Sequence, residues 1–141
     1  MIRIETLEDP TPALPVLREL RGTIGEKTFQ TRLQAAQKAG YQMMAAFQAE
    51  DVVGVLGYRI VHDICWGQTF FIDDLVVTAL GRGHGVGGAL LGHATQTAHQ
   101  LECDHIRLCS GLTRVDAHRF YEAHGMTGFS KQFVLALNGG Q

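Results

Sequence analysis

The spacing of hydrophobic positions changes several times along the chain. Apolar and polar residues alternate over residues 2–6, which predicts a short strand. Leucines at every third position behind two prolines predict a helix near residues 14–20. A second helical pattern covers residues 26–39 and stops at Gly40. The chain therefore begins with one predicted strand and two predicted helices.

Three segments in the middle of the chain are rich in β-branched, aromatic and other apolar residues. Short polar stretches separate them, Glu50-Asp51 after the first segment and residues 62–68 after the second. Apolar runs between such breaks are typical of consecutive strands joined by hairpins. We therefore expect an antiparallel meander of three strands, over residues 41–48, 52–61 and 69–77.

The second half of the chain returns to a mixed pattern. A single apolar stripe, at positions 90, 91, 94, 98 and 101, predicts a helix after a glycine-rich stretch. A strand, a short helix that stops at Gly125, and a last strand are predicted to follow, over residues 105–110, 115–125 and 129–137. This order predicts an α/β (α+β) fold with a mixed, mostly antiparallel sheet, in a single domain that spans residues 1–141.

Composition narrows the class of protein. Of the 141 residues, 45% are hydrophobic and 18% are charged, a balance typical of a globular protein. The net charge of −2 comes without runs of like charge, so we expect neither a nucleic-acid partner nor a membrane partner. The N-terminus lacks the basic start and apolar core of a signal peptide, and no apolar run is long enough for a membrane span.

The cysteines and histidines predict neither disulfides nor a metal site. Cys65, Cys103 and Cys109 form an odd set without CxxC spacing, which favours buried free thiols in a cytoplasmic protein. His118 and His124 are six residues apart, which does not place them on one helix face, and no HExxH motif occurs. No metal is therefore expected among the cofactors.

The glycine-rich stretch GRGHGVGG, residues 81–88, joins a predicted buried strand to a predicted helix. Helix N-termini carry unpaired N–H groups and a partial positive charge, and glycines let a phosphate approach those groups closely. Arg82 adds a full positive charge beside them. Strand, turn and helix together predict a loop that binds a pyrophosphate.

Three interpretations of this loop compete. In the first interpretation, the loop is a tight turn without a ligand, although five glycines and an arginine exceed what a turn needs. In the second, the loop belongs to a dinucleotide fold, because Gly83, Gly85 and Gly88 fit G-x-G-x-x-G. However, the next predicted strand ends in Ser110 and Gly111 rather than in an acidic residue, and an antiparallel meander does not suit a parallel sheet. The third interpretation is a coenzyme A site.

The coenzyme A interpretation comes from a resemblance to a known family. Leu75-Val76-Val77 followed by Arg82-Gly83-His84-Gly85-Val86-Gly87 resembles the acetyl-CoA motif of the GNAT superfamily of N-acetyltransferases, whose signature is matched by Arg82, Gly85 and Gly87. Further along, DAHRFYEAHGM resembles a second block of the family, through Ala117, Phe120, Tyr121, Gly125 and Met126. The run from Arg114 to Tyr121 looks most like the aminoalkylphosphonate N-acetyltransferase branch.

The resemblance implies a fold, a co-substrate and roles for particular residues. The fold is that of the GNAT acyl-CoA N-acyltransferases, a six- to seven-stranded sheet flanked by about four helices. Acetyl-CoA is the co-substrate: its pantetheine arm pairs with the backbone of the strand, and the loop binds its pyrophosphate. The Val77 N–H stabilises the oxyanion, and Tyr121 protonates the departing thiolate. The residues implied to bind the cofactor are Leu75, Val76, Val77, Arg82, Gly83, His84, Gly85, Val86, Gly87, Gly88, Ser110 and Tyr121.

Asp73 and Asp74 sit side by side in an otherwise apolar strand, directly before the cofactor segment. A carboxylate in such a strand is unfavourable unless it has a partner or a task. Neighbouring residues on a strand point to opposite faces, so only one of the two is expected to face the cleft. The resemblance favours Asp74 as the base that deprotonates the amine, with Asp73 or a water relay as the alternatives.

The sequence leaves the acceptor open. We expect transfer to a primary amine of a small molecule by direct attack in a ternary complex. The alternatives are a protein N-terminal or lysine acetyltransferase and a non-catalytic, CoA-binding regulatory module. Members of the family often dimerise, so a homodimer is expected. The acceptor pocket should come from the N-terminal helices and the meander, with Phe29, Arg32, Tyr41, Tyr58, His62 and Trp66 as candidates.

Overall fold

The computed structural model describes residues 1–138, and the chain divides after Leu108 into two compact units. Residues 1–108 form the first unit, and the chain from Cys109 onward forms the second. The single domain expected over residues 1–141 stays a prediction.

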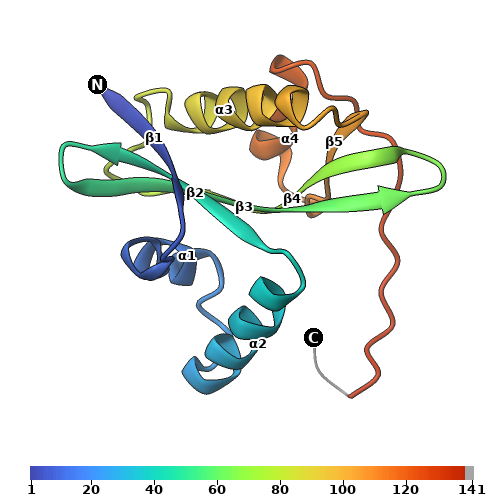
Figure 1. Cartoon of the computed structure of the whole chain (residues 1–141), viewed down its shortest axis with the longest axis horizontal. Helices are drawn as coiled ribbons and strands as arrows, with labels where there is room; N and C mark the ends of the chain where they lie inside the picture. Colours follow the sequence, from blue (N-terminus) through green and yellow to red (C-terminus); the bar gives the residue numbers. More distant parts are fainter. Residues whose placement is uncertain (139–141) are drawn as a thin grey trace. The chain divides into compact units, whose positions relative to one another are not determined.

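The first unit is built on a five-stranded sheet with the strand order β1-β2-β3-β4-β5 (Figure 1). The first four strands pair antiparallel to one another, as the meander pattern predicts, and the last pairs parallel to its neighbour. The strands are β1 (Ile2–Leu7), β2 (Gln42–Gln48), β3 (Asp51–Asp63), β4 (Gly67–Val77) and β5 (His105–Leu108).

Helices cover both faces of this sheet. A 3₁₀ turn, η1 (Thr11–Ala13), leads into α1 (Leu14–Leu20), which is followed by α2 (Glu26–Lys38). These two helices lie on one side of the sheet, and α3 (Val86–Gln100) lies on the other (Figure 1). The chain leaves α2 at Gly40, whose φ of +103° suits a residue without a Cβ. The predicted helix boundaries are confirmed to within a residue or two.

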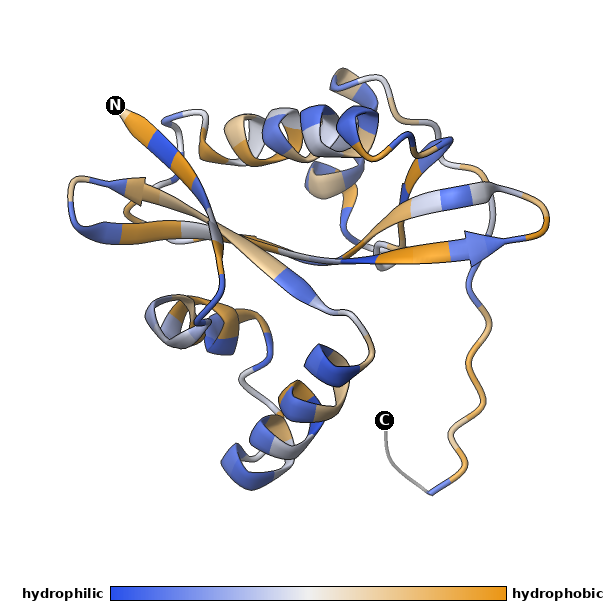
Figure 2. Cartoon of the chain, viewed as in Figure 1, coloured by the Kyte–Doolittle hydropathy of each residue, from blue (hydrophilic) through white to orange (hydrophobic). Residues whose placement is uncertain are grey.

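The hydrophobic core has a layer on each side of the sheet. In Figure 2, hydrophobic and hydrophilic residues alternate around α2, as expected for a helix that buries one face. On the side of α1 and α2, the buried residues are Ala13, Val16, Leu17, Phe29, Leu33, Tyr41, Met43 and Val55. From α3, the buried residues are Val86, Leu90, Leu91, Ala94 and Ala98, which follow the stripe that the sequence predicts.

The second unit holds one described helix, α4 (Val115–Ala123), and Gly125 follows it with a φ of +88°. The strand predicted over residues 129–137 is wrong, because residues 126–138 form neither helix nor strand. A strand requires a neighbour that pairs with its backbone, and the described part of the second unit holds no strand. Large apolar side chains in this segment are 73% to 90% exposed: Phe129, Phe133, Val134, Leu135 and Leu137.

The predicted α/β class is confirmed by this element order, although the sheet of the described residues has five strands rather than six to seven. All three cysteines are free, as expected, but Cys65 and Cys109 are exposed rather than buried. Within residues 1–138, we find no helix with the length and apolar character that a membrane crossing requires.

Candidate active site

A β-bulge shapes the middle of β4. Gly57 of β3 pairs with Asp74, but the next residue, Tyr58, pairs with Ile72, so Asp73 is an extra residue on β4. An extra residue interrupts the alternation of side chains along a strand. Both Asp73 and Asp74 line the same pocket as a result. The prediction that only one of them faces the cleft is therefore wrong, and the bulge is the physical reason.

Asp74 is held from two directions. The Tyr41 hydroxyl donates a hydrogen bond to Asp74 Oδ2 at 2.7 Å. Arg21 donates to Asp74 Oδ1 from Nη2 at 2.6 Å and from Nε at 3.0 Å. The Asp74 side chain is only 10% exposed, so these charge-assisted hydrogen bonds offset much of the cost of burying the carboxylate.

Asp73 has a separate partner. The Arg59 guanidinium of β3 donates from Nε to Asp73 Oδ2 at 2.7 Å and from Nη2 to Oδ1 at 2.9 Å. These two parallel bonds raise the pKa of Arg59 above its usual value. Arg21 also donates to the Asp73 carbonyl at 3.2 Å, and so connects the end of α1 to the bulge. Two arginines thus fix both aspartates and the backbone between them.

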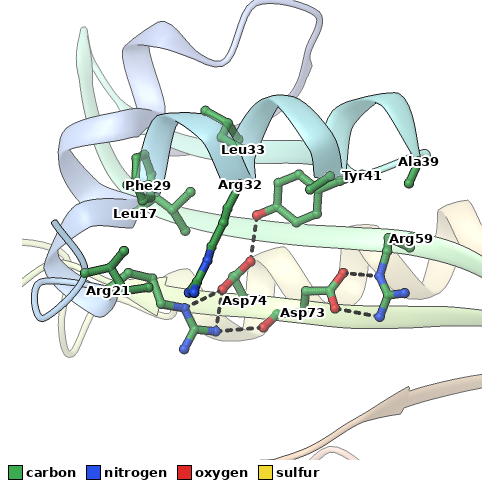
Figure 3. A pocket seen from close by; sticks show the side chains of 12 residues that line it. Leu17, Arg21, Phe29, Arg32, Leu33, Ala39, Tyr41, Arg59, Asp73 and Asp74 are labelled. Atoms are coloured by element: carbon green, nitrogen blue, oxygen red, sulfur yellow. Dashed lines mark hydrogen bonds and ion pairs between the residues drawn. The ribbon is translucent and has the colours of Figure 1, made fainter. Parts of the chain in front are cut away.

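Tyr41 is buried beneath α2, and its hydroxyl points to Asp74 (Figure 3). Burial, followed by the negative charge of Asp74, raises the pKa of Tyr41 far above its ordinary value. The phenol therefore remains a donor at any working pH. Gly57 provides its space, because a Cβ at that position would overlap the Tyr41 hydroxyl.

The two aspartates lie in a pocket of about 450 Å³ on the α1 and α2 side of the sheet (Figure 3). Its polar residues come from β3, β4, the middle of α2 and the segments that follow α1 and α2. Its apolar wall comes from α1, α2 and the segment between them. Of the acceptor candidates from the sequence, Phe29, Arg32 and Tyr41 line this pocket, whereas Tyr58, His62 and Trp66 do not. The apolar lining consists of Leu17, Ile24, Phe29, Leu33, Ala36 and Ala39.

The last residues of β4 have one free edge within the first unit. Leu75, Val76 and Val77 pair with residues 54–56 of β3. On the opposite edge, β5 pairs only with residues 69–72, and no other strand of residues 1–108 continues the ladder. Backbone N–H and C=O groups at such an edge can bind an extended ligand in the manner of an added strand.

The glycine-rich loop leads from this edge to the start of α3. Gly83 and Gly85 adopt positive φ angles of +79° and +75°, and Gly85 is the N-cap residue of the helix. No side chain caps this helix, so its first N–H groups keep the unsatisfied donors of a helix N-terminus. The loop from Arg82 to Gly85 is exposed, whereas Val86 is buried and anchors the helix. Together with the free strand edge, this loop fits an extended arm that ends in a pyrophosphate.

Two predicted site residues, Ser110 and Tyr121, belong to the second unit. The Ser110 hydroxyl oxygen is buried and has no hydrogen-bond partner within the described residues. Tyr121 lies on α4 with its ring half-buried, and burial raises the pKa of the phenol while the charge of Arg114 opposes that shift. The remaining predicted residues, from Asp73 to Gly88, form one continuous stretch of the first unit.

Three residues of this site could not be predicted from the sequence. Arg21 and Arg59 carry no motif, and only the docking of α1 and the register of β3 bring them to the aspartates. Gly57 gives no signal of its own either. The sequence does show two carboxylates in an apolar strand, which indicates that each needs a charged or hydrogen-bonding partner. It does not indicate which residues those partners are. No group of three or more His, Cys, Asp or Glu residues that could hold a metal ion occurs among residues 1–138.

Comparisons with known proteins agree with this geometry. The chain is 34% identical over 122 residues, 86% of each chain, to the uncharacterized N-acetyltransferase YhdJ of Bacillus subtilis. It is 32% identical over 96 residues to an aminoalkylphosphonate N-acetyltransferase of Salmonella typhimurium, a match that covers 65% of this chain and 60% of the relative. The solved structure of the aminoglycoside N-acetyltransferase AAC(6')-Iy in complex with CoA has the same fold. The comparison of the two structures gives a TM-score of 0.84 at 12% sequence identity, and it covers 98% of this chain and 95% of the aminoglycoside N-acetyltransferase chain.

The family itself is shown by a family model. The model of the acetyltransferase (GNAT) family matches residues 5–126, from within β1 to beyond the end of α4. The relative from Bacillus subtilis, which exceeds 30% identity over most of both chains, gives the same result. The predicted resemblance and enzyme class are confirmed. This chain therefore belongs to the acetyltransferase (GNAT) family and is an acetyl-CoA-dependent N-acetyltransferase.

Proposed function

We propose that this enzyme transfers the acetyl group to a primary amine of a small molecule, by direct attack in a ternary complex. The observation that carries this proposal is the pocket beside the bulge. Its volume of about 450 Å³ suits a small ligand, and its two aspartates immediately precede the strand segment predicted to hold the thioester. The relative that acts on aminoalkylphosphonates supports a small-molecule acceptor.

On the donor side, acetyl-CoA supplies the activated acetyl group, and the protein supplies its position. The free edge of residues 75–77 supports a role for their backbone in binding the pantetheine arm, with the Val77 N–H directed at the oxyanion. The exposed loop from Arg82 to Gly85 and the uncapped start of α3, residues 86–88, bind the pyrophosphate. The buried Ser110 hydroxyl, which has no hydrogen-bond partner within residues 1–138, contributes a hydrogen bond to the cofactor or to the amine.

On the acceptor side, the amine must lose a proton to attack. Asp74 receives this proton, directly or through a water molecule, and Asp73 is the alternative acceptor on the same pocket. Arg21 and Tyr41 hold the Asp74 carboxylate in place during this step. A fixed base within reach of the nucleophile contributes by general base catalysis.

Tyr121 completes the reaction by protonating the departing thiolate. Burial raises the pKa of this phenol, so it keeps its proton throughout the neutral range. An acid that stays protonated at working pH is available at each turnover. The cytoplasmic location and the homodimer expected from the sequence stay predictions.

A panel of acceptors tests the proposal. The enzyme with acetyl-CoA is offered small amines and lysine-containing peptides, thiol release is followed, and products are identified by mass. Acetylated small amines are the expected result. Acetylation of peptides alone would make the enzyme a protein acetyltransferase. Binding of acetyl-CoA without transfer to any acceptor would leave a regulatory module instead.

A further inference from the structure

The charged side chains of the pocket already have partners within the protein. Arg59 forms two parallel hydrogen bonds with Asp73, and Arg21 forms two hydrogen bonds with Asp74. Arg32, the third arginine that lines the pocket, is not free either. A ligand with a charged or strongly polar tail would have to leave water and compete for groups that are already paired, which brings little net gain. The charged residues therefore do not favour a polar tail on the acceptor.

Half of the twelve residues that line the pocket are apolar, and several of them belong to the core. Leu17, Phe29 and Leu33 are between 3% and 8% exposed, so they form a fixed wall. A hydrocarbon group laid against this wall would be removed from water without losing hydrogen bonds. The wall therefore favours an acceptor that brings apolar surface into the pocket.

The carboxylates and the apolar wall lie on different elements. Asp73 and Asp74 belong to β4, whereas Phe29 and Leu33 belong to α2 (Figure 3). Asp74 directly precedes Leu75, the first residue of the segment proposed to hold the pantetheine arm. An amine at the aspartates is therefore close to the donor along β4, and α2 provides the surface for the rest of the molecule.

The size of the side chains changes along the face of α2 that lines the pocket. Phe29, Leu33 and Ala36 are four and three residues apart, which places them on one helix face. Phe29 and Leu33 are large, whereas Ala36 and the next lining residue, Ala39, are small. Ala36 is half-buried and packs against the core. Its methyl group leaves space beside the helix that a larger side chain would fill.

We propose that the acceptor is a primary amine with an uncharged apolar tail, an alkyl chain or an aromatic ring, and that Ala36 sets the size of the tail. This inference rests on the proposed acetyl transfer to a small molecule. The amine nitrogen bonds to the acetyl carbon and the C–S bond breaks, while Asp74 takes the proton of the amine and Tyr121 protonates the thiolate. The volume of about 450 Å³ suits such a molecule.

Matched amines test the apolar tail. Hexylamine and 2-(2-aminoethoxy)ethanol have the same number of non-hydrogen atoms, but the second carries an ether and a hydroxyl in place of hydrocarbon. We expect kcat/KM for hexylamine to exceed the values for this ether amine and for propylamine tenfold or more, because the longer apolar chain is buried. The ether oxygen makes its amine less basic, so a larger neutral fraction cannot explain a preference for hexylamine. Phenethylamine extends the test to a ring, and 2-aminoethylphosphonate extends it to an anion.

Variants at Ala36 test the residue. Ala36→Leu should reduce the ratio of kcat/KM for hexylamine over propylamine at least fivefold, because the added side chain occupies the space of the tail. Ala36→Val should reduce this ratio less. Ala35→Leu, which enlarges an exposed residue of the same helix outside the pocket, is the matched control and should keep the full ratio. A rise in Tm with acetyl-CoA shows that each variant is folded.

The possible outcomes separate the two proposals. Equal or better use of the ether amine or of 2-aminoethylphosphonate than of hexylamine would overturn the apolar tail, while the small-molecule function stands. An unchanged ratio in both Ala36 variants, or an equal reduction in Ala35→Leu, would overturn the assignment of Ala36. Acetylation of peptides with no transfer to any of these amines would overturn both the inference and the proposed function.

Discussion

At the residue scale, the candidate site depends on two carboxylates with different surroundings. Asp74 is 10% exposed and accepts hydrogen bonds from Tyr41 and Arg21, whereas Asp73 is 23% exposed and is paired with Arg59. The more buried carboxylate also lies beside the segment 75–77. These differences favour Asp74 as the group that takes the proton from the amine, and they make the two aspartates separable by experiment.

Replacing each aspartate by asparagine should therefore lower the activity to different extents. We expect Asp74→Asn to lower kcat/KM by about 10²-fold, as loss of a general base does. Asp73→Asn should lower kcat/KM less, because Asp73 is then only a neighbour of the base. The measurement is kcat/KM of both variants with the same acceptor at the same pH. A larger loss in Asp73→Asn would exchange the two roles.

Replacing Tyr121 by phenylalanine should slow turnover without loosening the cofactor. We expect kcat to fall by about 10²-fold, because the thiolate loses its proton donor while the ring and its packing remain. The dissociation constant for CoA, measured by calorimetry, should stay within about twofold of the parent value. Full activity in this variant would remove the acid role from Tyr121.

Tyr41 predicts a pH dependence of stability. The pKa of Tyr41 in the folded protein is raised above the value of about 10 in the unfolded chain. Its contribution to the free energy of unfolding is therefore complete below about pH 10 and is lost as the pH rises above that value. The slope for one such proton is about 1.4 kcal/mol per pH unit. In urea unfolding from pH 8 to 11, the free energy of unfolding of the parent should fall as the pH rises. It should fall less steeply in Tyr41→Phe. Equal slopes in both proteins would contradict the prediction.

The residues of the site differ in how far the sequence reveals them. Asp73 and Asp74 stand out because carboxylates are rare in an apolar strand, and Tyr121 comes from a motif. Arg21 and Arg59 could not be predicted, because their role depends on where α1 ends against β4 and on the register of β3. The residues that pair with a given carboxylate are determined by the tertiary structure. The spacing of side chains along one segment carries no information about them.

At the scale of elements, the bulge in β4 depends on a small residue in the strand beside it. Gly57 lies opposite Asp74, and the Tyr41 hydroxyl occupies the space that a side chain at Gly57 would need. The strand, the bulge and the buried tyrosine are therefore a single packing unit. A methyl group at this point should disturb all three.

We predict that Gly57→Ala destabilises the protein by about 1–3 kcal/mol, the usual cost of overpacking a core. It should also lower kcat/KM, because displacement of Tyr41 releases Asp74. The matched control is Gly92→Ala in α3, where a Cβ would meet no atom within 4 Å. That change should stabilise the helix by about 0.5–1 kcal/mol. Urea unfolding measures both, and equal stability of the two variants would contradict the prediction.

The periodicity of the sequence predicted most elements but not the bulge or the last strand. Helix stripes and apolar runs located α1 to α4 and β1 to β5, because burial of one face leaves a period in the sequence. The bulge adds a residue that only the pairing register reveals. The segment 129–137 has the composition of a strand, yet composition cannot supply a neighbour with which to pair.

At the scale of the whole molecule, the cofactor should act as a stabiliser. A ligand that binds only the folded state raises the free energy of unfolding by about 2.7 kcal/mol at a concentration of 100 times its Kd. For a chain of 141 residues this corresponds to an increase in Tm of several degrees. Because the predicted site includes a helix N-terminus and Arg82, part of this gain should come from the negative charge of the pyrophosphate.

The Tm should therefore rise with acetyl-CoA, and the rise should shrink as salt screens the charges around the loop. Arg82→Gln and Gly85→Ala should reduce it, the first by removing a charge and the second by straining a backbone with a φ of +75°. Lys38→Gln removes an exposed positive charge from the last turn of α2, on the other side of the sheet from α3, and should leave the rise unchanged (Figure 1). Thermal unfolding at a fixed excess of acetyl-CoA over protein measures all four proteins. An equal rise in parent and loop variants would mean that the pyrophosphate is held elsewhere, whereas no rise in the parent would contradict the whole cofactor site.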